Sequence, residues 1–360
     1  MDRIKVCHIC NMDLNGKSAF VCSLLENTDF EKYDVTVIAY RTVYVRSVMF
    51  RLEKLPVRIV TPPSGGILTF CRFLDMFLRE NRFDVCHAHM WDQSGLFLLI
   101  AHRRGIPVRV AHSHTTSKAE GRYCHLKEFF RDRILWYLLR HMIGRHANRF
   151  IACSEAAAHW LFPSSVIQGK RYFVVPNGID LAKYRCPGRQ RHVPVHILYT
   201  GSLVLEKNPV FVVQVYYEYL KRDPDARMTM IGRGKLDGPV REEIARLGIA
   251  EHITFVSETD DMPRFYKSAD VFLLPSCIEG LGIVLIEAQA SGLPCLVSDF
   301  VPPEAQCGLL TYKALDDGPS AWAEYITEVL QNKDKAIDMN RLMRYDAKNT
   351  ARIMDRIYGL

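Results

Sequence analysis

Two glutamates flank a short glycine-containing turn in the second half of the chain, and this arrangement could bind a sugar diphosphate. Glu279 and Glu287 are eight residues apart, and residues 280–282 between them read Gly-Leu-Gly. The apolar run that ends at Leu274 predicts a strand, and the apolar stretch after the turn predicts a helix that begins near Gly282. Glu279 would then lie on the loop before the helix, and Glu287 about a turn and a half inside it.

The start of this helix and the two carboxylates offer different groups to a ligand. The N–H groups of Gly280, Leu281 and Gly282, at the positive end of the helix, would suit a diphosphate, and glycine lets the backbone approach it closely. Glu279 could accept hydrogen bonds from sugar hydroxyls. Glu287 could hold a ribose diol, as acidic residues do in dinucleotide-binding folds. The spacing alone fits equally well a surface helix with two solvated glutamates.

Short apolar runs that predict buried strands alternate with amphipathic, helix-like stretches along most of the chain. In the second half the predicted strands are Val195–Thr200, Met228–Ile231, Ile253–Val256, Val271–Leu274 and Cys295–Val297. Buried strands separated by helices are typical of βαβ units and of a parallel sheet covered on both faces. The predicted fold class is therefore α/β, with two Rossmann-like, doubly wound domains that face an interdomain cleft.

The alternation stops at Pro176-Asn177-Gly178 and restarts at Val195, after a stretch rich in arginine and poor in apolar residues. The predicted segments are an amino-terminal domain at 1–183, a linker at 184–194, a carboxy-terminal domain at 195–335, and a C-terminal helix at 336–360 that could cross back to the first domain. Two domains are also expected because a single core rarely grows beyond ~250–300 residues and this chain has 360.

Composition favours an ordinary globular protein, since 48% of the residues are hydrophobic and 24% are charged. The start, Met1–Cys10, lacks the long apolar core of an export signal, and no run reaches the ~18 apolar residues of a membrane span. The 11 cysteines have no framework spacing, so we expect them to be reduced, in a cytoplasmic protein.

The net charge of +7 is concentrated in one segment, Lys118–Arg149, which holds eight basic residues and three acidic ones. Such a basic face could meet anionic lipid, nucleic acid or a phosphate-bearing substrate. Residues 131–140 combine arginines with a six-residue apolar run. This combination predicts either a helix seated on an anionic membrane surface or a helix buried in the amino-terminal domain.

Several further motifs lie in a fixed order around the two glutamates. They are Asn177-Gly178-Ile179-Asp180, Tyr199-Thr200-Gly201-Ser202-Leu203 with Lys207, Ile231-Gly232-x-Gly234, Ser268-Ala269-Asp270-Val271, Pro275-Ser276-x-x-Glu279-Gly280-Leu281 through Glu287-Ala288, and Gly292-Leu293-Pro294. In this order they resemble the motifs of the family 4 retaining glycosyltransferases, which have the GT-B fold. The chain is most similar to the bacterial members that build exopolysaccharide, capsule or O-antigen.

The resemblance implies metal-independent transfer of a sugar, without a cofactor, from a nucleotide-sugar to a glycan or lipid-linked acceptor. In the resembling subfamily the donor is mostly a UDP-sugar. The carboxy-terminal domain would bind the donor, and the amino-terminal domain would lie on the acceptor side. Contact with the inner face of the cell membrane through Lys118–Arg149 is the expected peripheral interaction, and nucleic acid is not an expected partner.

The resemblance also assigns roles to residues. It implies catalytic roles for Glu279, at the donor sugar, and for His114. The implied donor-binding set is Gly16, Gly201, Ser202, Lys207 (at the diphosphate), Gly280, Leu281, Gly282 and Glu287 (at the ribose). On the acceptor side it points to His89 and Asp92.

Two departures from the family pattern keep other functions open. The family usually has arginine where this chain has Ser202, and its first loop usually carries paired glycines where only Gly16 stands here, beside Lys17. A guanidinium beside a diphosphate is a strong charge-assisted contact. These departures favour, as one alternative, a degenerate, non-catalytic partner protein of the same fold. A nucleotide-sugar epimerase of that fold is the second alternative, because fold alone does not exclude it.

Two patterns could indicate a metal site, although none is expected. Cys7-His-Ile-Cys10 has C-x-x-C spacing but no second pair. His87 and His89, with His112 and His114, would form a cluster at two strand ends. The family resemblance explains the same histidines as the acceptor side of the cleft.

Overall fold

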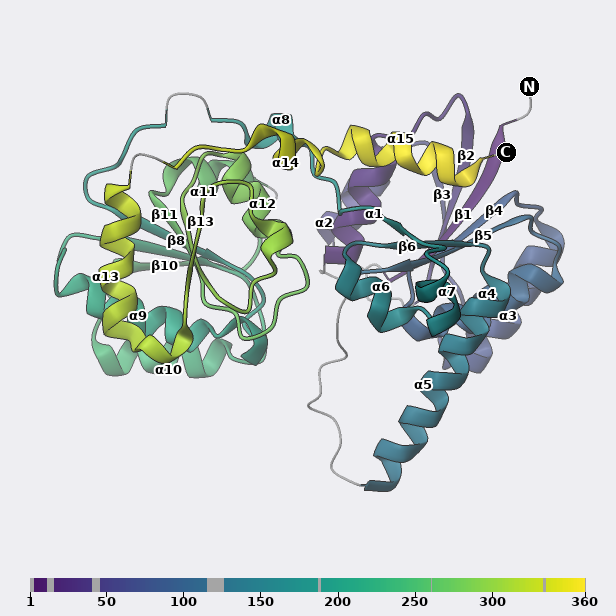
Figure 1. Ribbon diagram of the computed structural model, residues 1–360, viewed down its shortest axis with the longest axis horizontal. Coiled ribbons are helices and arrows are strands. Elements are labelled where there is room, and N and C mark those ends of the chain that lie inside the picture. Colours follow the sequence, from purple (N-terminus) through teal and green to yellow (C-terminus); the bar gives the residue numbers. More distant parts are fainter. Residues whose placement is uncertain are drawn as a thin grey trace. The chain divides into compact units, whose positions relative to one another are not determined.

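The computed structural model describes residues 3–11, 16–40, 46–114, 126–186, 189–259, 261–332 and 335–359. The chain forms two compact units (Figure 1). Unit 1 comprises Met1–Gly178 and Ala347–Leu360, and unit 2 comprises Ile179–Asp346.

Unit 1 is built on a parallel sheet with the strand order β3-β2-β1-β4-β5-β6-β7. Its strands are β1 (Ile4–Cys10), β2 (Tyr33–Ala39), β3 (Val57–Val60), β4 (Val85–Ala88), β5 (Val108–Ser113), β6 (Arg149–Ala152) and β7 (Phe173–Val174). The strand order reverses between β1 and β4. In open α/β sheets ligands bind outside the carboxyl ends of the strands at such a switch point.

Helices cover both faces of this sheet (Figure 1). They are α1 (Gly16–Glu26), α2 (Arg46–Leu52), α3 (Ile67–Glu80), η1 (Trp91–Gln93), α4 (Ser94–Arg103), α5 (Leu126–His146), α6 (Glu155–Leu161), α7 (Ser164–Gln168) and α15 (Ala347–Tyr358). Side chains alternate along β1. Val6 and Cys10 pack with α1, α2 and α15, whereas Cys7 and Ile9 pack with α3, α4 and α6.

Helix α15 belongs to unit 1, although it follows all of unit 2 in the sequence. Its buried side chains Met354, Ile357 and Tyr358 join the core beside α1 and β2. The predicted C-terminal segment 336–360 is thus divided, because α14 (Met339–Met343) lies in unit 2.

Unit 2 has a second parallel sheet, with the order β10-β9-β8-β11-β12-β13. Its strands are β8 (His196–Thr200), β9 (Arg227–Ile231), β10 (Ile253–Val256), β11 (Val271–Leu274), β12 (Cys295–Ser298) and β13 (Leu310–Lys313). Its remaining helices are α8 (Leu181–Tyr184), η2 (Leu205–Lys207), α9 (Pro209–Leu220), α10 (Asp237–Leu247), η3 (Ala250–His252), α11 (Met262–Ser268), α12 (Ile283–Ala290), η4 (Pro303–Ala305), η5 (Leu315–Asp317) and α13 (Gly318–Gln331). The two parallel α/β sheets confirm the predicted fold class of two Rossmann-like domains.

The boundary between the units differs from the predicted one. It falls after Gly178, so the described part of the predicted linker 184–194 lies within unit 2. One cause is Arg189, whose guanidinium donates to the backbone carbonyls of Ala269 and Ser291. These bonds fasten a polar stretch to the domain, although its composition resembles that of a linker.

Candidate functional site

The predicted diphosphate turn lies at the carboxyl end of β11, where the chain enters α12. Gly282 caps the helix in the left-handed conformation, with φ 72° and ψ 66°. A Cβ at this position would also lie 2.9 Å from the Leu285 side chain, so the turn requires glycine. Glu279 precedes the helix and Glu287 is its fifth residue, as predicted. Leu285 N donates to the N-cap carbonyl of Gly282 at 2.8 Å. The N–H groups of Ile283 and Val284, in the first turn, have no acceptor within the helix and so can face an anion.

Lys207, at the end of η2, forms an ion pair with Glu279 of this turn. The Lys207 ammonium donates to Glu279 Oε2, and the two side chains are 23% and 7% exposed. The backbone carbonyl of Glu206 accepts from Cys277 N at 2.8 Å, which ties the end of η2 to the loop after β11. The Ser276 hydroxyl also approaches Glu279 Oε2, at 3.4 Å. The fold therefore joins two residues that are 72 positions apart and that the family resemblance assigns to one substrate.

A second loop, at the end of β8, is fixed by close backbone contacts. Gly201 N donates to Ile231 O at 3.0 Å, and Leu203 N donates to Arg233 O at 2.9 Å. A Cβ on Gly232 would lie 1.9 Å from the Gly201 carbonyl oxygen. The Gly232-x-Gly234 motif therefore lets the loop with Gly201 pack directly on the neighbouring turn.

Tyr199 lies beneath this loop and is fully buried. Its hydroxyl donates to the backbone carbonyl of Ser202 at 3.3 Å. Burial, and secondly the negative charge of Glu279, raise the pKa of Tyr199, so the phenol stays protonated. Ser202 itself is exposed, and the carbonyl contact holds its backbone in place.

Glu287 binds two tyrosines in addition to any role toward a ligand. Its Oε1 accepts from the Tyr184 hydroxyl at 2.9 Å, and its Oε2 accepts from the Tyr266 hydroxyl at 2.8 Å. These bonds join α8, α11 and α12. Each carboxylate oxygen has a second acceptor site, so a ribose diol would share Glu287 with the tyrosines. The sequence analysis did not find this pairing.

The predicted site residues His89 and His114 belong to a largely buried cluster of five histidines at the carboxyl ends of β1, β4 and β5. They are His8, His87, His89, His112 and His114. All five lie on one face of the sheet, because His8 is the register partner of His87 and the others follow at i+2 spacing. The sequence analysis predicted this cluster except for His8.

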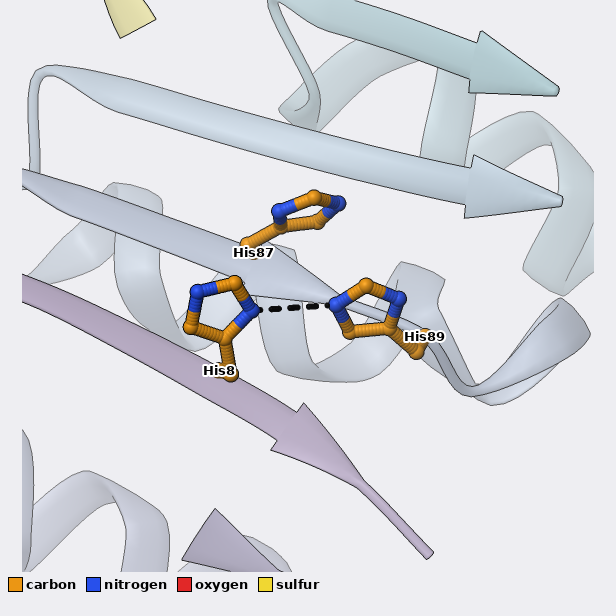
Figure 2. Close-up of side chains that lie close together, drawn as sticks. All are labelled: His8, His87 and His89. Carbon is orange, nitrogen blue, oxygen red and sulfur yellow. Dashed lines mark hydrogen bonds between the residues drawn. The ribbon is translucent and has the colours of Figure 1, made fainter. Parts of the chain in front are cut away.

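Hydrogen bonds link His8, His89 and His114 into a chain. His8 Nδ1 contacts His89 Nε2 at 3.1 Å (Figure 2), and His89 Nδ1 contacts His114 Nε2 at 2.8 Å. Burial lowers the pKa of His8 to about 4. Burial, and then the neighbouring imidazoles, lower the pKa of His87 and His89 well below the ordinary value. These rings are therefore neutral at pH 7, each with one donor and one acceptor nitrogen.

The orientations of His8, His87 and His89 favour hydrogen bonding over a metal ion shared by these three rings. Ligand atoms of His8, His87 and His89 lie within 4.8 Å of one another. However, His87 stacks on His89, with ring centroids 4.1 Å apart and planes 26° apart (Figure 2). Metal bonds lie in the plane of each imidazole, so the bonding directions of stacked rings run side by side instead of meeting at one ion.

Two other predicted residues lie near this edge of unit 1. Asp92, in η1, is buried, and its Oδ1 accepts from Gln93 N at 3.1 Å. Gly16 is the first residue of α1, and residues 12–15 of the predicted first loop lie outside the described residues. Both assignments stay predictions.

The predicted membrane segment is described only in part, because residues 115–125 and the side chains of 126–132 lie outside the described set. The amino-terminal half of α5 projects beyond the other elements of unit 1 (Figure 1). Its exposed apolar patch consists of Ile134, Leu135, Tyr137 and Leu138, each at least half exposed. The predicted burial of this run is therefore wrong for these four side chains.

Arg140 does not share that exposed surface. Its guanidinium donates to the backbone carbonyls of Leu161 and Phe162 and lies 5.0 Å from the Trp136 ring centroid.

Among the described residues, we find no helix with the length and apolar character that crossing a bilayer requires.

Comparison with known proteins places both units in one enzyme class. A family model described as Glycosyltransferase Family 4 matches residues 14–183, and one described as Glycosyl transferases group 1 matches residues 188–349. EpsF of Bacillus subtilis (strain 168), named as a glycosyltransferase, is 31% identical over 342 residues, which cover 89% of this chain and 86% of EpsF.

The names of two other similar entities, one protein and one solved structure, mention a substrate or a bound ligand. The UDP-Gal:alpha-D-GlcNAc-diphosphoundecaprenol alpha-1,3-galactosyltransferase of Escherichia coli is 23% identical over 236 residues, which cover 62% of this chain and 59% of that protein. The crystal structure of Anabaena Alr3699/HepE in complex with UDP and glucose matches with a TM-score of 0.77 and 15% identity, over 99% of this chain and 100% of that one. The chain therefore belongs to the family 4 glycosyltransferases and has their GT-B fold.

Proposed function

We propose that this glycosyltransferase is a retaining, metal-independent enzyme of bacterial surface polysaccharide synthesis. Its donor would be a UDP-sugar and its acceptor a glycan or lipid-linked glycan. The observation that carries the donor half of this proposal is the Lys207–Glu279 pair at the turn into α12. Two similar proteins support the donor and acceptor classes. The name of the Escherichia coli galactosyltransferase mentions UDP-Gal and diphosphoundecaprenol, and the Anabaena structure is a complex with UDP and glucose.

The pair fits the charges of a nucleotide-sugar. Lys207 has three ammonium donors, and the bond to Glu279 uses one of them. The others, with the first N–H groups of α12, would bind the diphosphate and stabilise the charge that grows as it departs. Glu279 would accept from sugar hydroxyls, and its charge would favour the positive character that develops on the sugar carbon. Tyr199 and Ser276 would hold this arrangement from below.

Substitution at the pair tests the donor site. We expect Lys207→Met and Glu279→Gln each to lower kcat about 100-fold or more, because each removes charge stabilisation of the transition state. Lys221→Met is the matched control, since Lys221 is an exposed lysine of unit 2 paired with Glu218. Transfer rates and UDP affinity would be measured together. Full transfer activity in both variants would refute the site assignment.

Two measurements test whether the reaction retains the anomeric configuration and whether it proceeds without a metal ion. The anomeric configuration of the first product, followed by NMR, should match that of the donor; an inverted product would rule out retention. Transfer should persist in excess chelator, and its loss followed by recovery on adding a divalent ion would rule out metal independence.

Ser202 motivates the second candidate, a non-catalytic partner protein of the same fold. Its exposed hydroxyl stands where the family usually places a guanidinium, beside the proposed phosphate position. Calorimetry with UDP and UDP-sugars discriminates between an active transferase and a non-catalytic partner protein, because the non-catalytic protein should bind none of these ligands. A product assay without acceptor separates transfer from epimerisation.

The exposed apolar patch on α5 supports peripheral membrane contact near a lipid-linked acceptor. Sedimentation with anionic vesicles tests this, and we expect Leu135→Glu with Leu138→Glu to weaken binding. Leu68→Glu is the control, since Leu68 is 71% exposed on α3 of the same unit. An absence of binding at low salt would refute the contact.

A further inference from the structure

The carboxylate of Glu287 is held by one phenol on each oxygen. Tyr184, on α8, donates to Oε1 at 2.9 Å, and Tyr266, on α11, donates to Oε2 at 2.8 Å. The direction of both bonds is unambiguous, because a phenol donates and an ionised carboxylate only accepts. Burial, and then the charge of Glu287, raise the pKa of Tyr266 well above its ordinary value, so this phenol keeps the proton that it donates.

Packing holds the two tyrosine rings in place. Tyr266 is fully buried, and its ring centroid lies 5.9 Å from that of Phe272. The partly buried ring of Tyr184 lies edge-on to Tyr266, with centroids 5.8 Å apart and planes 62° apart. The helices that carry them, α8 and α11, both contact α12. Closely packed side chains have few other positions available, so the two hydroxyls are rigid supports.

These supports set the orientation of the Glu287 carboxylate. The last torsion of a glutamate has only broad preferences, so without partners the carboxylate would take many orientations. Glu287 is partly exposed, and each carboxylate oxygen has a second acceptor site. It lies about 7.5 Å along α12 from the capping residue Gly282. A nucleotide whose phosphates bind at the first turn would therefore bring its ribose to a carboxylate that is already oriented.

We propose that Tyr184 and Tyr266 are positioning residues that orient the Glu287 carboxylate to accept from the 2′ and 3′ hydroxyls of the nucleotide ribose. This inference rests on the proposed function, in which Glu287 binds the ribose of the UDP-sugar. A group that is held in its binding orientation loses less conformational freedom when the ligand binds. The two tyrosines thereby increase the selectivity of the site for ribose over a sugar without these hydroxyls, and they act through Glu287.

The experiment compares UDP with 2′,3′-dideoxy-UDP, which lacks both hydroxyls, by calorimetry on the full chain. We expect wild type to bind UDP about 10-fold or more tightly than the analogue, because hydrogen bonds to a charged group are lost with the hydroxyls. Tyr184→Phe and Tyr266→Phe should each weaken UDP binding about 5-fold, because the carboxylate is less well oriented. Both should leave the affinity for the analogue nearly unchanged.

Tyr216→Phe is the matched control. Tyr216 is as fully buried in unit 2 as Tyr266, but its hydroxyl donates to the backbone carbonyls of Ala226 and His252. Its substitution removes a buried phenolic hydroxyl without touching Glu287. The ratio of the two affinities should therefore stay at the wild-type value, whatever the effect of this substitution on stability.

A double substitution tests whether the tyrosine acts through the carboxylate. Glu287→Ala should abolish the preference for UDP over the analogue. Tyr184→Phe added to Glu287→Ala should then have no further effect on the ratio. A second reduction in UDP affinity of about 5-fold in this background would contradict a positioning role.

Four results would overturn the proposal: equal affinities of wild type for the two ligands, a preference that neither tyrosine substitution lowers, an equal effect of Tyr216→Phe, or tighter UDP binding by the tyrosine variants. The last would show that the phenols compete with the ribose. Tyr184 is only partly buried, so Tyr184→Phe keeps the test decisive if Tyr266→Phe fails to fold.

The same measurements separate this inference from the proposed function. A wild type that transfers sugar from a UDP-sugar but binds UDP and the analogue equally would refute the inference alone. A wild type that binds no UDP and uses no UDP-sugar would refute the proposed function, and the inference with it.

Discussion

Acid should destabilise unit 1 through its buried histidines, and His8 allows the size of the effect to be worked out. Burial lowers the pKa of His8 to about 4, against an ordinary value of about 6.5 in the unfolded chain. Between these values the unfolded state binds more protons than the folded state. The free energy of unfolding therefore falls as the pH drops through 6.5, and the loss from His8 levels off below about pH 4.

The two pKa values set the magnitude. His8 alone should lower the free energy of unfolding by about 2 kcal/mol at pH 5 and by about 3 kcal/mol at pH 4, relative to neutral pH. His87, His89 and His112 act in the same direction, since burial lowers each pKa. The cavity beside His8 is lined by both signs of charge, from Asp29 and Asp355 and from Lys348 and Arg352.

Urea unfolding at several pH values is the assay, followed by tryptophan fluorescence because three of the four tryptophans lie in unit 1. Wild type and His8→Leu would be compared at neutral pH and at pH 5. Between neutral pH and pH 5, the free energy of unfolding of the variant should fall by about 2 kcal/mol less than that of wild type, whatever the stability of the variant at neutral pH. Equal losses in the two proteins would refute the assignment of a depressed pKa to His8.

Three further predictions concern unit 2. Ser202→Arg should tighten UDP binding about 5-fold, equivalent to roughly 1 kcal/mol for an exposed charged contact; calorimetry that finds unchanged affinity would place the phosphates elsewhere. Gly232→Ala should destabilise the protein by about 2 kcal/mol or more, since its Cβ would meet the Gly201 carbonyl oxygen at 1.9 Å and its φ is +148°. Gly238→Ala, with no atom within 4 Å of the new Cβ, is the matched control and should be neutral in the same thermal melts. Tyr266→Phe should lower the free energy of unfolding by about 1–3 kcal/mol, because Glu287 loses a buried hydroxyl partner; urea curves that coincide with wild type would show that this bond does not matter.

The local parts of the site could be predicted because they depend on neighbours in the sequence. Apolar runs of strand length marked the strand before the diphosphate turn, and the glycine at position 282 marked the start of α12. The spacing of Glu279 and Glu287 followed from helix geometry. The i+2 spacing within His87–His89 and within His112–His114 predicted that each pair faces one side of the sheet.

Other features could not be predicted from local pattern. Strand β13 (Leu310–Lys313) has mostly half-buried side chains and lacks the continuous apolar run that identifies a buried strand. The arginine-rich segment near Arg189 has the composition of a linker, but its hydrogen-bond partners are backbone carbonyls about 80 and 102 positions away. The composition of a segment does not indicate which distant residues it will bind.

The sequence by itself determined the element types, the two-domain division in outline and the residues that could do chemistry, because backbone sterics and side-chain periodicity act over a few residues. Tertiary structure alone decided which distant side chains meet. The pairing of Lys207 with Glu279, the bond from Tyr184 to Glu287 and the contact of His8 with His89 all cross 70 or more positions. Strand order and packing fix these contacts, and no local pattern encodes the distance between two residues so far apart.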